Sequence, residues 1–289
     1  MQTLDDEKIK FLQEKANDIR QSIITSLIEA GSGHSAGPLG MADIFTALFF
    51  HVLKHDPNNP TWEDRDRLVL SNGHIVPVLY ATMAHAGYFP IAELSTLRKF
   101  GSKLQGHPHR EFLPALENSS GPLGSGLSQT VGMCLADQID HGRSSGKQFY
   151  CLLSDGEMGE GNTWEAVMLG NKEKLQNLTA IIDRNNIQIE GYTEDVLPLE
   201  PLADKWRAFG WHVQVIDGHN FEAIIGAVGQ AHAEFSRPSV IIANTIPGKG
   251  VSFMEREYSW HGKPPTYEEG MKALQELRTL GGKIKSEHE

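Results

Sequence analysis

The chain has 289 residues, of which 39% are hydrophobic and 22% charged, and its formal net charge is −11. This composition is ordinary for a globular protein and leaves room for a sizeable core. The acidic balance excludes non-specific nucleic-acid binding as the main function, because such binding depends on Lys and Arg neutralising phosphates, but small anionic ligands stay open.

Apolar residues recur at three- and four-residue spacing near the N-terminus and predict a first helix from about Asp5 to Ala30, with Gly31 as its stop. A second helix is expected from about Met41 to Leu53. Five short, almost continuously apolar runs then predict strands buried on both faces. These strands are expected at 67–70, 149–153, 178–182, 212–216 and 239–244. Further helices are expected at 74–87, 126–141, 163–175, 199–209, 221–235 and 267–280, before a charged tail at 283–289.

Strands that alternate with helices favour a doubly wound α/β fold, with a mostly parallel sheet of about five strands and helices on both faces. No repeat, low-complexity segment or linker interrupts the pattern, so residues 1–289 are expected to form a single domain. Such folds bind ligands at the carboxyl ends of their strands. The residues that follow each strand are therefore the first candidates for chemistry.

The N-terminal segment is acidic and lacks the apolar stretch of a signal peptide, and the apolar runs are too short to cross a bilayer. We therefore expect a cytoplasmic protein with no membrane partner. The two cysteines, Cys134 and Cys151, lie in apolar contexts and are expected to be buried, reduced thiols.

Polar residues follow the second and third predicted strands. Asp155 and Gly156 come after the first of these strands, and Asn185 and Asn186 after the next. If the two strands are neighbours, a carboxylate, an amide and a backbone carbonyl converge as an all-oxygen set suited to Mg²⁺ or Ca²⁺. Gly156 would let the backbone approach a phosphate closely, next to the N–H groups of the following helix. Either motif alone is more simply explained as a turn, but together they predict a metal and phosphate site.

These paired motifs resemble the thiamine-diphosphate motif, and the surrounding sequence resembles the N-terminal, diphosphate-binding half of transketolases over nearly the whole chain. The supporting motifs, in the family's order, are Gly31-Ser32-Gly33-His34 with Gly37–Asp43, Asp66–His74, Gly106-His107-Pro108, Gly121–Gly126 and Trp260-His261-Gly262. Ser35-Ala36-Gly37 and Ser154 depart from the common family sequence. Neither departure removes a ligand, but both leave the fine substrate preference open.

The resemblance implies thiamine diphosphate and Mg²⁺ as cofactors, with Ca²⁺ as an alternative ion. The implied metal ligands are Asp155, Asn185 and, through its carbonyl, Ile187. The implied cofactor-binding residues are His74, Gly121, Pro122, Leu123, Gly156, Glu160, Asn185 and His261. Among these, Glu160 would be a buried glutamate that links two active sites across an interface.

Ketol transfer requires proton movement, because the donor's C3 hydroxyl loses a proton and the acceptor carbonyl gains one. Imidazole can do this near neutral pH. The resemblance selects His34 and His261 for this role and His107 for holding the hydroxymethyl end of the donor ketose. His107 and His109 could instead form half of a zinc site, but no further Cys or His lies nearby in the sequence. The histidines read as surface or packing residues are His51, His55, His85, His141, His219 and His232.

In full-length members a pyrimidine-binding domain and a C-terminal domain follow the Trp-His-Gly segment. They supply the glutamate that activates the cofactor and the arginines that grip the sugar phosphate. No such segment follows here, so the resemblance implies a partner chain that carries them, an α2β2 assembly, and activity only when both chains are present.

The expected reaction is transfer of a two-carbon ketol unit between sugar phosphates, as in the pentose phosphate pathway. Two alternatives stay open. The same cofactor could serve a 1-deoxyxylulose-5-phosphate synthase or a ketolase for an unusual sugar, although His107 and the Trp260-His261-Gly262 motif favour ketol transfer over pyruvate decarboxylation. The chain could also be a non-catalytic module that senses thiamine diphosphate.

Overall fold

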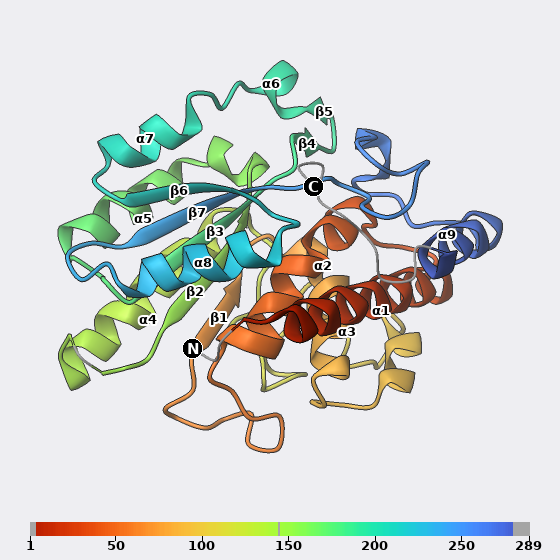
Figure 1. The fold of residues 1–289 in the computed structure, drawn as a ribbon, viewed down its shortest axis with the longest axis horizontal. Helices are drawn as coiled ribbons and strands as arrows, with labels where there is room; N and C mark the ends of the chain where they lie inside the picture. The colour runs from red at the N-terminus through yellow and green to blue at the C-terminus, as the bar shows by residue number, and fades with distance from the viewer. Residues whose placement is uncertain (1–3, 144, 280–289) are drawn as a thin grey trace.

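The computed structural model describes residues 4–143 and 145–279. Its centre is a five-stranded sheet in the order β1-β2-β3-β7-β6, in which every neighbouring pair is parallel (Figure 1). The strands are β1 (Arg67–Leu70), β2 (Phe149–Ser154), β3 (Leu178–Arg184), β6 (His212–Asp217) and β7 (Ser239–Asn244). All the predicted strands are present, and the predicted α/β fold class is confirmed.

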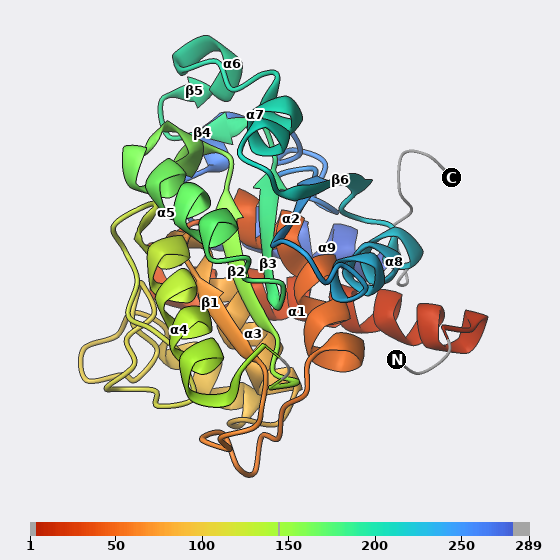
Figure 2. The same cartoon turned by 90° about the vertical axis from the view of Figure 1, so that its left-hand side faces the viewer.

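Helices cover both faces of this sheet, with α4 and α5 on one side and α1 and α8 on the other (Figure 2). The first layer is α4 (Ser125–His141), α5 (Gly161–Lys172) and α7 (Leu202–Ala208). The second is α1 (Asp6–Ala30), α2 (Ala36–Ala47) with a π-helical turn over Leu48–Val52, α3 (Val76–His85) and α8 (Phe221–His232). Three short elements follow β3, namely β4 (Ile187–Gln188), β5 (Gly191–Tyr192) and α6 (Thr193–Val196).

Each strand contributes to two cores, because successive side chains point to opposite faces of a sheet. In β2, Tyr150 and Leu152 pack with the layer that contains α1, α2, α3 and α8, whereas Cys151 and Leu153 pack with the layer of α4, α5 and α7. This double burial explains why β2, β3 and β7 are almost continuously apolar instead of alternating. The prediction of burial on both faces is wrong for β6, which lies at the edge of the sheet and leaves Val215 50% exposed. Cys134 and Cys151 are both buried free thiols, as predicted.

The start of α2 differs most from the sequence prediction. The helix begins at Ala36 and not near Met41, so it includes Pro38 and Gly40. Pro38 lies in the first turn, where its missing N–H has no intrahelical acceptor to lose. Gly40 is required by packing, because a Cβ there would lie 2.9 Å from the carbonyl oxygen of Ile246. The prediction was wrong because it treated these helix-breaking residues as a loop.

The last helix, α9 (Tyr267–Thr279), packs against α1. Its predicted final residue, Leu280, and the charged tail at 283–289 lie outside the described residues. In the part of the chain that the structure describes, no helix combines the length and the apolar character needed to cross a membrane.

Candidate active site

The two polar motifs meet at the carboxyl edge of the sheet. β2 and β3 are neighbours, with Ser154 opposite Asp183, so the residues that follow these strands lie side by side. The backbone N–H of Asn186 donates to Oδ2 of Asp155 at 2.7 Å. Asn186 has φ +65°, a left-handed conformation that Asn tolerates better than most residues. The convergence that the sequence predicts is therefore present.

Asp155 is fully buried, and one of its oxygens has no partner. Its Oδ2 accepts from Nη1 of Arg184 at 3.1 Å and from Asn186, whereas Oδ1 has no hydrogen bond within the described residues. A buried carboxylate oxygen of this kind is unfavourable unless a ligand completes it. Burial raises the pKa of Asp155 to about 6, although the Arg184 guanidinium acts in the opposite direction.

A chain of hydrogen bonds orients Asn185. Its side-chain amide donates to Oδ2 of Asp183 at 2.8 Å, and its Oδ1 accepts from the N–H of Ile187 at 3.0 Å. Asp183 in turn accepts from the hydroxyl of Thr245, which follows β7. Burial, together with the nearby charge of Asp155, raises the pKa of Asp183 to about 7. A divalent cation would offset the negative charge of two neighbouring buried carboxylates.

These residues fit a magnesium ion shared with a diphosphate. Mg²⁺ takes oxygen ligands and usually keeps several from phosphate and water, so one carboxylate, one amide and one backbone carbonyl are a suitable protein contribution. Over residues 4–143 and 145–279, no three Cys, His, Asp or Glu side chains gather into a metal site. The zinc alternative for His107 and His109 therefore gains no further ligands there.

Three of the predicted histidines form a cluster at the same edge. The ring centroids of His34 and His74 are 5.0 Å apart, those of His74 and His261 5.1 Å, and those of His34 and His261 5.6 Å. The three come from the segment before α2, the turn after β1 and the end of the 3-10 turn Tyr258–Trp260. His107 is more exposed and lies close enough to influence both His34 and His74 electrostatically.

The cluster is neutral at physiological pH. Burial lowers the pKa of His34 and His261 to about 4, and repulsion from His261 contributes to the shift at His34. Burial also lowers the pKa of His74 well below its usual range. Nδ1 of His34 has no hydrogen-bond partner among the described residues. Neutral imidazoles with an unoccupied ring nitrogen can accept a proton from a hydroxyl group.

The remaining predicted residues surround these two groups. Gly121 and Leu123 are half-buried and Pro122 is exposed, all just before α4, and Gly156 is half-buried after β2. Glu160 differs from the expectation of burial. It is exposed in this single chain, at the N-terminal cap of α5. A role as a buried link would therefore require a second chain to cover it.

Glu157 organises the site but is not among the residues that the sequence analysis selected. It is fully buried and accepts from the N–H of Gly124 at 2.6 Å, the N–H of Ser154 at 2.8 Å and the hydroxyl of Ser71. It therefore joins the ends of β1 and β2 to the loop before α4. Its only sequence signal is an acidic residue after Asp-Gly, which a surface turn explains equally well.

Replacing Glu157 by Ala should lower the free energy of unfolding by about 3 kcal/mol, because buried donors lose their shared acceptor. Urea denaturation measures this change. The matched control is Glu165→Ala on α5, where the side chain is exposed and a change within about 0.5 kcal/mol is expected. Equal stability of both variants would show that Glu157 does not organise the site.

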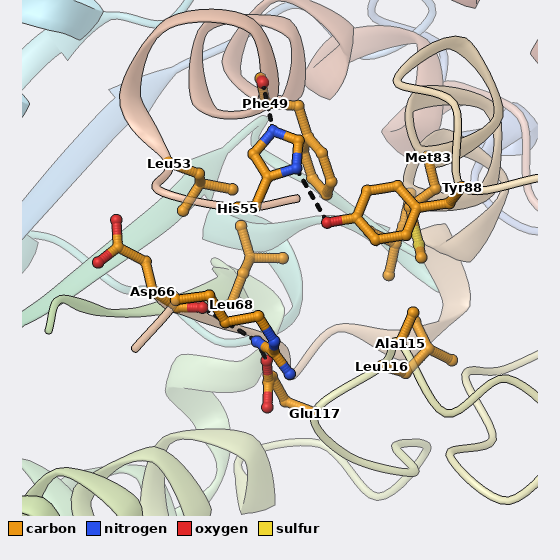
Figure 3. Close-up of a pocket in the computed structure, with 12 residues that line it drawn as sticks. Phe49, Leu53, His55, Asp66, Leu68, Met83, Tyr88, Ala115, Leu116 and Glu117 are labelled. Carbon is orange, nitrogen blue, oxygen red and sulfur yellow. Dashed lines mark hydrogen bonds and ion pairs between the residues drawn. The ribbon is translucent and has the colours of Figure 1, made fainter. Parts of the chain in front are cut away.

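A small cavity near the other end of β1 is separate from this site (Figure 3). There His55 bridges the carbonyl of Phe49 at 2.8 Å and the hydroxyl of Tyr88 at 2.9 Å, in agreement with its predicted packing role. The cavity also adjoins the buried ion pair of Arg65 and Glu117. Its volume of about 40 Å³ has room for water but not for a metabolite.

Comparison with known proteins identifies the family. The family model described as the thiamine diphosphate binding domain of transketolase matches residues 12–283. The chain is 46% identical over 270 residues to the 6-deoxy-6-sulfo-D-fructose transketolase subunit SqwG of Clostridium sp. (strain MSTE9), a match that covers 93% of this chain and 97% of that protein. It is 39% identical over 281 residues to an apulose-4-phosphate transketolase subunit from Phocaeicola vulgatus, a match that covers 97% of this chain and 99% of that protein.

Solved structures of transketolases have the same fold as this chain. The transketolase of Campylobacter jejuni superposes with a TM-score of 0.88 at 35% identity, over 96% of this chain and 43% of that one. Fold, site and sequence thus define a thiamine-diphosphate-binding domain. The chain belongs to the transketolase family. It spans almost the full length of the two subunit relatives and less than half of the longer C. jejuni chain.

Proposed function

We propose that this chain, as one domain, is the diphosphate-binding subunit of a two-subunit transketolase. The enzyme would transfer a two-carbon ketol unit from a ketose to an aldose through thiamine diphosphate and Mg²⁺. The observation that carries the proposal is the unpartnered, buried oxygen of Asp155 at the same sheet edge as a cluster of neutral histidines. The first group suits a metal and diphosphate, and the second suits proton transfer at sugar hydroxyls.

Different residues of this chain would bind the metal ion, the diphosphate and the rings of the cofactor. Asp155 and Asn185 would hold Mg²⁺ by their side chains and Ile187 by its carbonyl, while Gly156, His74 and His261 would contact the diphosphate. The loop that contains Gly121, Pro122 and Leu123 would border the cofactor's rings. When bound, thiamine diphosphate supplies the reactive carbon that carries the two-carbon unit.

The histidines would accept protons from the sugar substrates and donate protons to them. His34 and His261 are neutral near pH 7, so either can accept the proton of the donor's C3 hydroxyl and return one to the acceptor carbonyl oxygen. His107 lies at the more exposed side of the cluster, where it would hold the hydroxymethyl end of the donor. The shared burial that keeps these rings neutral would also exclude water from the reacting groups.

A partner chain would supply the pyrimidine-binding and C-terminal domains, in an α2β2 assembly. The two relatives that match this chain nearly end to end are themselves named as subunits. The predicted role of Glu160, which is exposed in this single chain, would require such a partner to cover it. Leu197, which is 55% exposed and lies close to Gly159, is an apolar side chain that such an interface would cover.

The substrates would be specialised anionic sugars. Two relatives whose own length is almost fully covered by the match, 97% and 99%, are named for a sulfo-sugar and for apulose 4-phosphate. Ordinary pentose phosphates are the second candidate, since the longer C. jejuni transketolase shares the same domain structure.

The test is reconstitution with a chain that carries the pyrimidine-binding domain. Ketol transfer from a ketose phosphate to an aldose phosphate should require both chains, thiamine diphosphate and Mg²⁺, and size measurement should detect a complex. Consumption of pyruvate in place of the ketose would instead indicate a synthase of the 1-deoxyxylulose-5-phosphate type. Tight cofactor binding by this chain alone, with no complex and no turnover, would indicate a sensing module.

A further inference from the structure

A buried polar network joins four segments that are far apart in the sequence. Both oxygens of Asp43, on α2, accept from the guanidinium of Arg20, on α1, at 3.0 and 2.6 Å. Oδ2 of Asp43 also lies 2.7 Å from Nδ1 of His219, which is in the loop between β6 and α8. Nε2 of the same ring lies 2.8 Å from the backbone nitrogen of Ile246, which follows β7. The sequence pattern predicts a surface or packing role for His219, but its ring makes a polar contact on each side.

These contacts determine the tautomer of His219. A backbone N–H can only donate, so Nε2 of His219 carries no proton and accepts from Ile246. The ring proton is then on Nδ1, which donates to Asp43. Burial alone would raise the pKa of Asp43, but Arg20 and His219 lower it to about 2, so the carboxylate is charged at neutral pH. Asp43 therefore orients the imidazole, and Nε2 becomes a directed acceptor for the backbone of a loop.

The loop at 245–248, which His219 contacts, reaches the proposed metal ligands. Thr245, the neighbour of Ile246, donates its hydroxyl to Asp183. Asp183 accepts in turn from the side-chain amide of Asn185 at 2.8 Å. Groups that orient a metal ligand affect the metal affinity although they do not touch the metal. The position of this loop should therefore influence the metal site.

The same loop contacts the segment that carries His34. The N–H of Gly248 donates to the carbonyl of Ala36 at 2.8 Å, and Ala36 begins α2 two residues after His34. One turn further along α2, Gly40 packs against the carbonyl of Ile246, from which a Cβ would lie only 2.9 Å away. The loop thus lies between the metal ligands and the histidine cluster and is attached to both.

The contact with His219 fixes this loop near its middle. Ile246 is buried, so without the acceptor at His219 its N–H would have no water to replace the lost bond. The loop would then shift to find another acceptor. Thr245 and Gly248, on either side of Ile246, would move with it, and both attachments would change together.

We propose that His219 is a positioning residue, which holds the loop at 245–248 through the N–H of Ile246 and so keeps the metal ligands and the histidine cluster in register. This inference rests on the proposed function for the identity of the ligands. His219 would touch neither the cofactor nor the sugar. Its effect would pass through Thr245 to the metal site and through Gly248 to the segment of His34.

Two variants separate the roles of the two ring nitrogens. Asn places its amide near the position of Nδ1, so His219→Asn keeps a donor for Asp43 and removes the acceptor for Ile246. Gln reaches the position of Nε2, so His219→Gln keeps an acceptor for Ile246. Calorimetry on the assembled enzyme, with thiamine diphosphate and Mg²⁺, should show about 10- to 100-fold weaker cofactor binding in His219→Asn, the range for a residue that orients a metal ligand. His219→Gln should bind with near wild-type affinity.

Measurements on the cofactor-free chain test the contact itself. Nitrogen-15 NMR of the wild type should show Nε2 of His219 unprotonated and coupled across the hydrogen bond to the N–H of Ile246. The pKa of His34, which burial lowers to about 4, should rise in His219→Asn as water enters the cluster, but not in His219→Gln. The matched control is His232→Asn, which removes the bond of a half-buried histidine on α8 to the hydroxyl of Tyr150 at 2.6 Å. It should leave the cofactor affinity and the pKa of His34 unchanged.

The outcomes distinguish this inference from the proposed function. If the wild-type assembly lacks ketol transfer but the variants show the expected pattern of cofactor binding, the proposed function fails and the positioning role stands. A protonated Nε2 in the wild type would overturn the positioning role, and this measurement does not depend on any variant folding. Cofactor binding in His219→Gln that is no tighter than in His219→Asn would overturn it as well.

Discussion

The variant Asp155→Asn should lose Mg²⁺-dependent binding of thiamine diphosphate, with an affinity about 100-fold or more below that of the wild type. Asp155 is the only carboxylate of the proposed ligand set, and its buried Oδ1 has no other partner in the described residues. Asn preserves the shape of the side chain and an oxygen for the N–H of Asn186. Asp155→Asn therefore changes the metal site mainly by removing one negative charge from its ligands.

Calorimetric titration of the assembled enzyme with thiamine diphosphate, with and without Mg²⁺, measures this loss. A thermal melt separates it from unfolding, because Arg184 would keep its contacts with Glu194 at 2.7 Å and Glu200 at 3.0 Å. The matched control is Asp204→Asn, an exposed aspartate of α7 whose ion-pair partner among the described residues is Arg207 at 2.7 Å. If cofactor affinity in Asp155→Asn equals that of the control, the metal site lies elsewhere.

The meeting of the two metal motifs could be predicted from the sequence because it depends on a simple geometric rule. Parallel strands that are neighbours end at one edge, so the residues after them converge once the strand runs are located. The residues that support the ligands follow no such rule. Thr245 reaches Asp183, and Glu157 reaches Gly124, across large sequence separations that only the packed sheet and loops bring together.

The environment of the histidines is a second feature that the sequence alone could not predict. The family resemblance selected His34, His74 and His261 by motif, but their shared burial depends on three distant segments packing at one place. The same packing decides their protonation state, which no local pattern contains. The early start of α2 also escaped prediction, because local propensity disfavours Gly40 in a helix while its contact with Ile246 requires it.

His261→Ala should lower turnover by about a hundredfold to ten-thousandfold, the range for removal of a general acid–base group. Folding should change little, since the half-buried ring contacts other imidazoles and leaves the two cores intact. Steady-state kinetics on the assembled enzyme and urea denaturation of the chain measure the two effects. The matched control is His141→Ala, at the exposed end of α4, which should retain wild-type turnover. Wild-type activity in His261→Ala would remove it from the proton-transfer role.

The pH dependence follows from the direction of the histidine shifts. Burial lowers the pKa of His34 and His261 to about 4, so both rings stay neutral, and able to accept a proton, as the pH falls from 7 to 5. Proton acceptance is lost only as the pH falls through about 4, where the rings become charged. NMR titration of the cofactor-free chain, with signals assigned by His34→Ala and His261→Ala, should therefore show midpoints near 4. Midpoints near the usual 6.5 would mean that the rings are solvated and that the cluster does not provide the neutral bases that ketol transfer needs.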